Sequence, residues 1–188
     1  GDFFVVVEVE CPEGEDALFE VLGESLEAEE ISDAVLAKNE QERMDIWRVR
    51  EESFLIDTQF PGGCWFDLSV PLSKLDGFLQ ESTARLHVLD PDMGIYMMGH
   101  LGDGNLHFTI AKSTPINHLY SEISAALFKG LAEIGGSFSA EHGIGTEKRV
   151  ALGVYGDPGK LALMAAIKKA IDPQNIMNPD KVLPPVPS

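Results

Sequence analysis

The sequence predicts an α+β fold in which helices pack on a largely antiparallel sheet. Segments rich in β-branched and aromatic residues alternate with segments whose apolar residues recur at helical spacing. The Asp-Gly pair at 103–104 is typical of a two-residue hairpin loop, which joins antiparallel strands. With 188 residues, 44% of them apolar, the chain can bury a core. Two rounds of strand, helix and strand are also consistent with two ferredoxin-like halves.

The first part of the chain supplies two strands and two helices. Residues 3–10 (FFVVVEVE) predict a strand, and residues 14–28 predict an amphipathic helix. Residues 31–39 predict a second strand, followed by a second helix over 40–54. The acidic run in the first helix is typical of a solvated face, and a docking surface for a basic partner is the alternative.

The second part contains the hairpin and further helices. Ser73 is the expected cap of the helix over 73–86, which follows the strand at 63–71. The tail, residues 172–188, is rich in proline and should run extended over a surface. The remaining elements are expected as strands at 63–71, 94–102 and 105–111 and as helices at 73–86, 117–134, 146–156 and 159–171.

Charge and composition exclude several classes of function. The net charge is −17, and residues 1–60 alone hold 18 acidic and four basic residues, which disfavours binding to nucleic acid or anionic lipid. No apolar run approaches the ~20 residues of a membrane span. Two cysteines, Cys11 and Cys64, form no disulfide framework, so we expect a reducing compartment and a cytoplasmic location.

Two histidines flank the hairpin turn in the stretch HLGDGNLH. If Asp103 and Gly104 form the loop, His100 and His107 are direct cross-strand neighbours with Cβ atoms about 5 Å apart. A divalent metal can bind both neutral imidazoles, and the alternative is a hydrogen-bonded pair of neutral histidines at a sheet edge. The alternate residues should face the core: Leu106, Phe108 and Ile110.

The stretch SAEHGIGTEKR offers a third ligand. Glu141 would complete a His-His-carboxylate set that leaves positions open for water or substrate. Neighbours on an extended backbone point in opposite directions, so we expect Glu141 and His142 to divide the roles of ligand and acid–base group. The alternative is an ordinary helix start capped by Thr146. Lys148 and Arg149 are expected on the surface of that helix.

Several stretches, taken in order, resemble the C-terminal part of the FAD-linked oxidases of the vanillyl-alcohol oxidase superfamily. The resemblance is closest to the branch that contains D-lactate dehydrogenase, D-2-hydroxyglutarate dehydrogenase and the flavin subunit of glycolate oxidase. The stretches are GHLGDGNLH (99–107), AEHGIGTEKR (140–149) and DPQNIMNPDKVL (172–183), with weaker support from IWRVREE (46–52) and FDLSVP (66–71).

The resemblance implies a domain organisation. Residues 1–171 would be the cap, or substrate-binding, domain, and residues 172–188 would run back toward a flavin domain. The family carries FAD on an N-terminal domain, and nothing in these 188 residues resembles it. We therefore expect a fragment of a larger dehydrogenase that is inactive without its flavin domain.

The resemblance also implies a reaction and its residues. A divalent metal (zinc, manganese or iron) would polarise a D-2-hydroxy acid, a base would take the hydroxyl proton, and the α-hydrogen would leave as hydride to FAD. The electron acceptor is not specified, and association with a membrane through partners is compatible with this scheme. The implied residues are metal ligands His100, His107 and Glu141, general base His142, substrate contacts Arg50 and Asn105, and cofactor contact Asn178.

Alternatives exist for individual residues and for the whole chain. Arg50 could instead pair with acidic neighbours on its helix, and Arg48 is a second candidate for its role. Asp103 and Asn105 could serve the turn alone. For the whole chain, the alternatives are the cap of a metal-free flavin oxidase and a stand-alone metal- or ligand-binding module.

One position departs from the family pattern. In the D-2-hydroxyglutarate branch, a lysine that meets the distal carboxylate is expected two residues before the Asp of FDLSVP, where this chain has Trp65. An indole cannot neutralise a second carboxylate. The resemblance therefore implies Trp65 as a substrate contact, and we expect it to favour a smaller D-2-hydroxy acid, or one with an apolar or aromatic tail.

Overall fold

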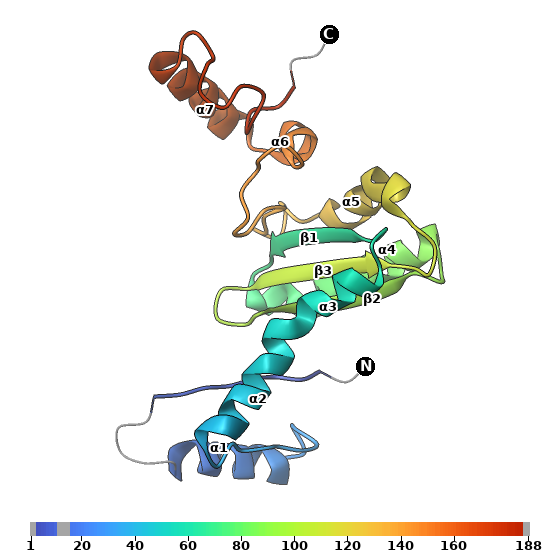
Figure 1. The fold of residues 1–188 in the computed structure, drawn as a ribbon, viewed down its shortest axis with the longest axis vertical. Coiled ribbons are helices and arrows are strands. Elements are labelled where there is room, and N and C mark those ends of the chain that lie inside the picture. Colours follow the sequence, from blue (N-terminus) through green and yellow to red (C-terminus); the bar gives the residue numbers. More distant parts are fainter. Residues whose placement is uncertain (1–2, 11–15, 186–188) are drawn as a thin grey trace. The chain divides into compact units, whose positions relative to one another are not determined.

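The computed structural model describes residues 3–10 and 16–185, and the chain forms two compact units, residues 1–56 and 57–188 (Figure 1). None of the helices described is long and apolar enough to cross a membrane. The helices and strands are α1 (Asp16–Glu27), α2 (Glu40–Glu51), α3 (Leu55–Gln59), β1 (Cys64–Ser69), α4 (Leu75–Leu89), β2 (Gly94–His100), β3 (Asn105–Ala111), α5 (Tyr120–Phe128), α6 (Arg149–Tyr155) and α7 (Pro158–Ile171), with short 3-10 turns at 52–54, 72–74 and 117–119.

The first unit contains the two predicted helices but neither predicted strand. Asn39 caps α2, because its side-chain oxygen accepts a hydrogen bond from the backbone N–H of Glu42 at 2.9 Å. Residues 3–10 and 31–39 form no strand. A strand requires a neighbour that takes up its backbone hydrogen bonds, and both ladders described in the chain join strands of the second unit. The two strand predictions were therefore wrong for the described structure.

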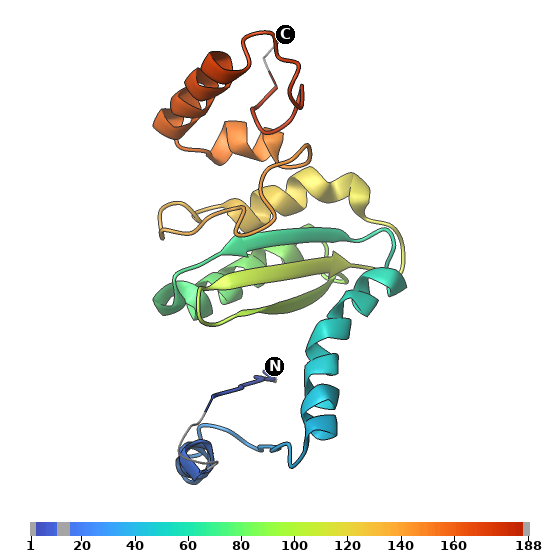
Figure 2. The ribbon, with the colours of Figure 1, turned by 60° about the vertical axis from the view of Figure 1, so that its left-hand side comes forward.

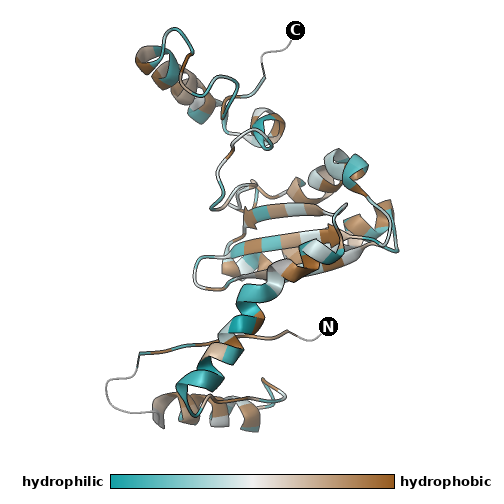
Figure 3. Ribbon diagram, viewed as in Figure 1, coloured by the Kyte–Doolittle hydropathy of each residue, from teal (hydrophilic) through white to brown (hydrophobic). Residues whose placement is uncertain are grey.

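The second unit is built on a three-stranded antiparallel sheet with the order β1-β3-β2. The predicted α+β class is confirmed, while the residues described contain this one sheet rather than two ferredoxin-like halves. Hydropathy alternates along the strands (Figure 3). One side of the sheet is the core face, on which β1 and β3 bury Phe66, Leu68, Leu106, Phe108 and Ile110. The other side, the polar face, carries Trp65, Asp67, Ser69, Tyr96, Met98, His100, Asn105, His107 and Thr109.

Helices α4 and α5 cover the core face (Figure 2). Phe78 of α4 meets Phe108 edge-on at a centroid distance of 6.4 Å, and Phe128 at the end of α5 meets Phe66 at 5.9 Å. Such contacts fix the core side of β1 and β3. The residues of the polar face are consequently held in register by packing on the opposite side of the same strands.

The hairpin between β2 and β3 is wider than predicted. His100 pairs with Asn105, and Met98 pairs with His107, so the loop comprises residues 101–104 rather than Asp103 and Gly104 alone. Gly104 has a positive φ of 71°, and a Cβ there would lie 2.1 Å from the carbonyl oxygen of Val70. The register is shifted by two residues, and because strand side chains alternate with period two, both histidines still lie on the polar face.

Several helix boundaries differ from the sequence prediction. Helix α5 ends at Phe128, six residues before the predicted end at 134. The chain turns directly after the helix, through Gly130, which has a φ of 76°. Ser73 makes no capping hydrogen bond, since it lies inside a 3-10 turn that precedes α4. Cys64 is buried and free, and Cys11 lies outside the described residues.

The tail after α7 turns repeatedly where an extended course was expected. Its backbone is left-handed at four residues, and the Asp172 carboxylate accepts the N–H groups of Ile176 and Met177 at 3.0 and 2.9 Å. The tail is tied back to the residues around α6 by a bond from Val182 N–H to the Gly145 carbonyl. The left-handed residues are Asn175, Asn178, Asp180 and Val182.

Candidate metal centre

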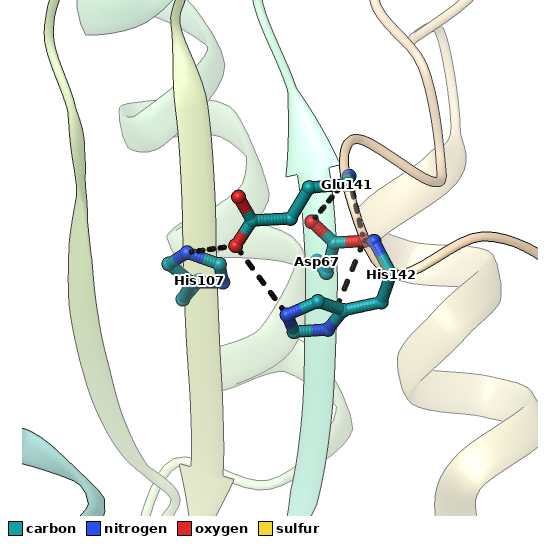
Figure 4. Close-up of side chains that lie close together, drawn as sticks. All are labelled: Asp67, His107, Glu141 and His142. Atoms are coloured by element: carbon teal, nitrogen blue, oxygen red, sulfur yellow. Dashed lines mark hydrogen bonds and ion pairs between the residues drawn. The ribbon is translucent and has the colours of Figure 1, made fainter.

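Four side chains from three parts of the second unit converge on the polar face (Figure 4). Asp67 comes from β1, His107 from β3, and Glu141 and His142 from the loop between α5 and α6. Each offers one ligand atom, and these atoms all lie within 4.8 Å of one another. Two imidazoles and two carboxylates are donors suited to zinc, manganese or iron, so the donor set fits a divalent metal.

The strand register explains why Asp67 and His107 meet. The two residues are directly paired in the β1–β3 ladder, so their side chains leave the sheet on the same side. Phe66 and Phe108, one position along each strand, are buried on the core face. Burial of these aromatic neighbours therefore forces the aspartate and the histidine onto the polar face.

A backbone bridge brings Glu141 and His142 to the same place. Ser69 at the end of β1 and Ser137 exchange two hydrogen bonds of 2.8 and 2.9 Å, which start the loop beside the strand. Glu141 Oε1 lies 3.2 Å from His107 Nε2 and 3.4 Å from His142 Nε2. The expectation that Glu141 and His142 point in opposite directions was wrong, because the backbone bends here instead of running extended.

Asp67 is the centre of a dense set of hydrogen bonds. It is 3% exposed and accepts the backbone N–H groups of Ala140, Glu141 and His142 at 3.2, 3.2 and 3.0 Å. The ammonium group of Lys148 lies 2.9 Å away. Burial works to raise the pKa of Asp67, but the bonds from Lys148, His142 and Glu141 outweigh it and hold the pKa below its usual range. The carboxylate is therefore charged at neutral pH.

The imidazole of His107 is in its neutral form, which is the form that binds metals. Burial lowers its pKa, and the attraction of Glu141 and Asp67, which acts in the opposite direction, does not compensate. The ring stacks on His142 at a centroid distance of 5.5 Å and meets His100 edge-on at 5.7 Å. At neutral pH, His107 is consequently neutral and can offer a nitrogen lone pair.

The other predicted site residues divide between the polar face and more distant segments. Asn105 is 3% exposed, and its side-chain oxygen has no hydrogen-bond partner among the residues described. Trp65 is 44% exposed and donates its indole N–H to Asp57. Arg50 belongs to α2 of the first unit, and Asn178 is exposed in the tail. The roles of these residues remain predictions.

Sequence reasoning missed Asp67 and misplaced Lys148. Lys148 was expected on the surface, but its side chain is 12% exposed and bonded to Asp67. Helix α6 begins at Arg149 without a side-chain cap, so the alternative in which Thr146 caps a plain helix start was wrong. The sequence did contain a signal for Asp67, because the only charged residue of the mainly apolar stretch CWFDLSV must find a partner when it is buried.

The sequence was compared with models of known protein families. The family described as "FAD linked oxidases, C-terminal domain" matches residues 1–182. The chain belongs to this family. The predicted resemblance to FAD-linked oxidases of the D-lactate and D-2-hydroxyglutarate branch is thus confirmed.

Several curated proteins are similar in sequence to this FAD-linked oxidase domain over most of the chain. D-2-hydroxyglutarate dehydrogenase, mitochondrial, of Arabidopsis thaliana is 37% identical over 85% of the chain, and D-2-hydroxyglutarate dehydrogenase of Xanthomonas citri pv. viticola is 33% identical over 81%. The mitochondrial protein of Rattus norvegicus is 33% identical over 97%. The chain spans 28%, 33% and 34%, respectively, of these three proteins, which is about a third of their length.

Proposed function

We propose that the chain is the substrate- and metal-binding part of an FAD-dependent dehydrogenase that oxidises a D-2-hydroxy acid to a 2-oxo acid. The observation that carries the proposal is the convergence of His107, Glu141 and His142 beside Asp67, in a chain of the FAD-linked oxidase family. Isolated acidic and histidine side chains are common on surfaces. Here the fold brings two strands and a remote loop together, so that the ligand atoms of four side chains lie within 4.8 Å of one another.

The proposed ligands of the metal are His100, His107 and Glu141. His107 is neutral, Glu141 lies within 3.2 Å of it, and the ring of His100 is in contact with the ring of His107. When bound, zinc, manganese or iron would act as a Lewis acid on the hydroxyl and carboxylate groups of the substrate. Asp67 is excluded from this set because its oxygens already accept four donors.

His142 is proposed as the general base. Its side chain is 62% exposed, so a substrate can reach it, and its ring lies between two carboxylates, with Nε2 3.4 Å from Glu141 and Nδ1 3.9 Å from Asp67. A general base of this kind takes the hydroxyl proton of the substrate at a ring nitrogen. The base therefore stands beside the proposed metal ligands without being one of them.

Asn105 and Arg50 are the proposed substrate contacts. The side-chain oxygen of Asn105 is buried without a partner among the residues described, and leaving such an atom unpaired is costly. A bound water would satisfy it, as would a substrate hydroxyl that enters when a covering side chain moves aside. Arg50 is proposed to hold the substrate carboxylate, as a planar guanidinium does with two parallel hydrogen bonds.

The substrate is proposed to lack a second carboxylate. Trp65 stands where a lysine was expected, and its indole N–H is bonded to Asp57, whose carboxylate also accepts the Thr109 hydroxyl at 3.0 Å. A distal carboxylate at this place would meet the carboxylate of Asp57 rather than the ammonium group of a lysine. D-2-hydroxyglutarate is the second candidate, because it is the substrate in the names of the curated relatives.

The flavin would lie on a separate domain of the parent protein. When bound, FAD would accept the hydride of the substrate α-carbon. Asn178, in the turns of the tail, is proposed to contact the flavin. The expected cytoplasmic location stays a prediction, since the names of several relatives give a mitochondrial location.

Calorimetric titration with manganese and zinc tests the metal centre. We expect one ion per chain, and at least about 100-fold weaker binding after His107→Ala, because a lost ligand should exceed the 10- to 100-fold effect of an outer partner. His87→Ala, at an exposed histidine of α4, is the matched control and should bind as the wild type does. Absence of binding in the wild-type chain would favour the metal-free oxidase.

A flavin assay tests the reaction. In the flavin-containing parent protein, D-2-hydroxy acids should bleach the flavin absorbance under anaerobic conditions, and the L-enantiomers should not. Binding of metal without flavin reduction by any hydroxy acid would favour the stand-alone binding module.

A further inference from the structure

Asp67 holds the backbone of the residues that carry the proposed ligand and base. Three successive N–H groups, those of Ala140, Glu141 and His142, point at its carboxylate from 3.0 to 3.2 Å. Such a run of N–H groups forms a concave anion site. Because the carboxylate belongs to the middle of β1, it fixes the loop to the rigid sheet.

Lys148 closes the same loop from its other end. Its ammonium group donates to Asp67 Oδ2 at 2.9 Å, to the Asp67 carbonyl at 3.3 Å and to Ser139 Oγ at 3.0 Å. Ser139 in turn donates to the Gly143 carbonyl at 2.9 Å. These three acceptors use all three hydrogens of the ammonium group. Lys148 therefore neutralises the buried carboxylate and ties both ends of the loop to it.

We propose that Asp67 and Lys148 form a positioning pair that directs Glu141 and His142 at His107. The inference rests on the proposed metal centre and adds two residues that act through others. Asp67 acts through the loop in this proposal: Ala140, His142 and Lys148 donate to its Oδ2, the Glu141 N–H donates to its Oδ1, and the Lys148 ammonium group balances its charge. A residue pair that orients ligands in this way commonly changes metal affinity by 10- to 100-fold.

The competing assignment makes Asp67 a direct ligand. Its oxygen lies within 4.8 Å of the donor atoms of the other three side chains, so distance alone permits coordination. The two assignments predict opposite effects of removing Lys148. If Asp67 were a ligand, loss of the competing ammonium group would free its oxygens and strengthen metal binding. If Asp67 positions the loop, loss of Lys148 weakens metal binding.

The experiment compares Lys148→Met, Lys148→Gln and Lys148→Arg in the 188-residue chain. Residue-specific amide hydrogen exchange of Ala140, Glu141 and His142 is measured by NMR without metal, and manganese affinity is measured by calorimetry. Lys160→Met, at an exposed lysine of α7, is the matched control. Melting curves establish that each variant is folded, and Lys148→Gln, which keeps a donor, replaces Lys148→Met if the latter unfolds.

We expect Lys148→Met to speed exchange of the three amides about tenfold or more and to weaken manganese binding about 10- to 100-fold, with Lys148→Arg restoring part of both. Unchanged exchange in a folded Lys148→Met or Lys148→Gln variant would overturn the inference, as would stronger manganese binding. If the wild-type chain binds no manganese, the proposed metal centre fails, and the inference built on it fails with it. The amide exchange would then still report whether Asp67 and Lys148 anchor the loop.

Discussion

His107 Nε2 and Glu141 Oε1 lie 3.2 Å apart, although one residue belongs to a central strand and the other to a loop beyond the next helix. The contact depends on two independent features of the fold. Packing of Phe108 on the core face sets the side from which His107 projects, and the Ser69–Ser137 bridge sets the path of the loop. Both features belong to the packing and backbone of the chain itself, so the protein preorganises the centre.

The first prediction separates the roles of His100 and His142. His100→Ala should weaken manganese binding by the chain at least about 100-fold, because it removes a proposed ligand, as His107→Ala does. His142→Ala should leave manganese affinity within about threefold, since a general base takes a proton from the substrate and does not hold the metal. In the flavin-containing parent protein, His142→Ala should slow flavin reduction about 100- to 10,000-fold.

The opposite result would show that His142, and not His100, is a metal ligand. Strong loss of metal in His142→Ala, with His100→Ala unchanged, would make His142 the third ligand, as the short distances among Asp67, His107, Glu141 and His142 permit. His118→Ala is a suitable control, because His118 lies in a 3-10 turn and is exposed.

The second prediction concerns the distal end of the substrate. Trp65→Lys alone should change the KM for D-2-hydroxyglutarate little, because Asp57 would pair with the new ammonium group. In the double variant Trp65→Lys, Asp57→Asn, the new ammonium group is free to meet the distal carboxylate. The KM for D-2-hydroxyglutarate should then fall about tenfold, as expected for one charge-assisted contact. The KM for D-lactate should not fall.

The measurement is steady-state kinetics of the parent protein with both substrates, and Trp65→Phe with Asp57→Asn is the control without the new charge. If the wild-type protein already prefers D-2-hydroxyglutarate, then another cation meets the distal carboxylate, and the substrate proposed from Trp65 is wrong.

The polar face was predictable from the sequence even though the hairpin loop was not. Alternation assigned His107 and Phe108 to opposite sides, and an error of two residues in the register leaves the sides unchanged. The observed four-residue loop makes a contact outside the hairpin, in which the Gly104 carbonyl accepts the Val70 N–H at 2.9 Å. A local Asp-Gly pattern contains no information about that neighbour.

The contact between Asp67 and Lys148 could not be predicted from local sequence patterns either. The partners of Asp67 lie some 70 to 80 residues further along the chain, and only the pairing of β1 with β3 and the Ser69–Ser137 bridge bring them together. The segment FFVVVEVE illustrates the converse. Its pattern predicts a strand, but a strand also needs a partner ladder, which a pattern cannot supply.

The third prediction tests the packing of the core face. Phe108→Ala should lower the free energy of unfolding by about 3–5 kcal/mol, because Phe108 is 1% exposed and packs edge-on against Phe78. Val88→Ala, at a residue of α4 that is 85% exposed, should change it by less than about 0.5 kcal/mol. Urea unfolding followed by circular dichroism measures both. A loss below about 1 kcal/mol for Phe108→Ala would contradict the packing described.

The fourth prediction concerns acid stability and the pair formed by Asp90 and Lys112. The hydrogen bond from Lys112, at 2.8 Å, holds the pKa of Asp90 below its usual range, and the N–H of Asp92 acts in the same direction. A carboxyl whose pKa is lower in the folded than in the unfolded chain stabilises the fold above the unfolded pKa. That contribution is lost as the pH falls through the folded pKa, below about pH 4.

Asp90→Asn should therefore destabilise the chain at neutral pH and flatten the fall in stability below about pH 4, because the asparagine does not titrate. Asp92→Asn is the control: Asp92 is 78% exposed and contacts the same lysine at 3.3 Å, so its removal should change the acid limb less. Urea midpoints between about pH 2.5 and 7 measure the effect. Parallel acid limbs for Asp90→Asn and the wild type would mean that the Asp90–Lys112 bond does not persist in solution.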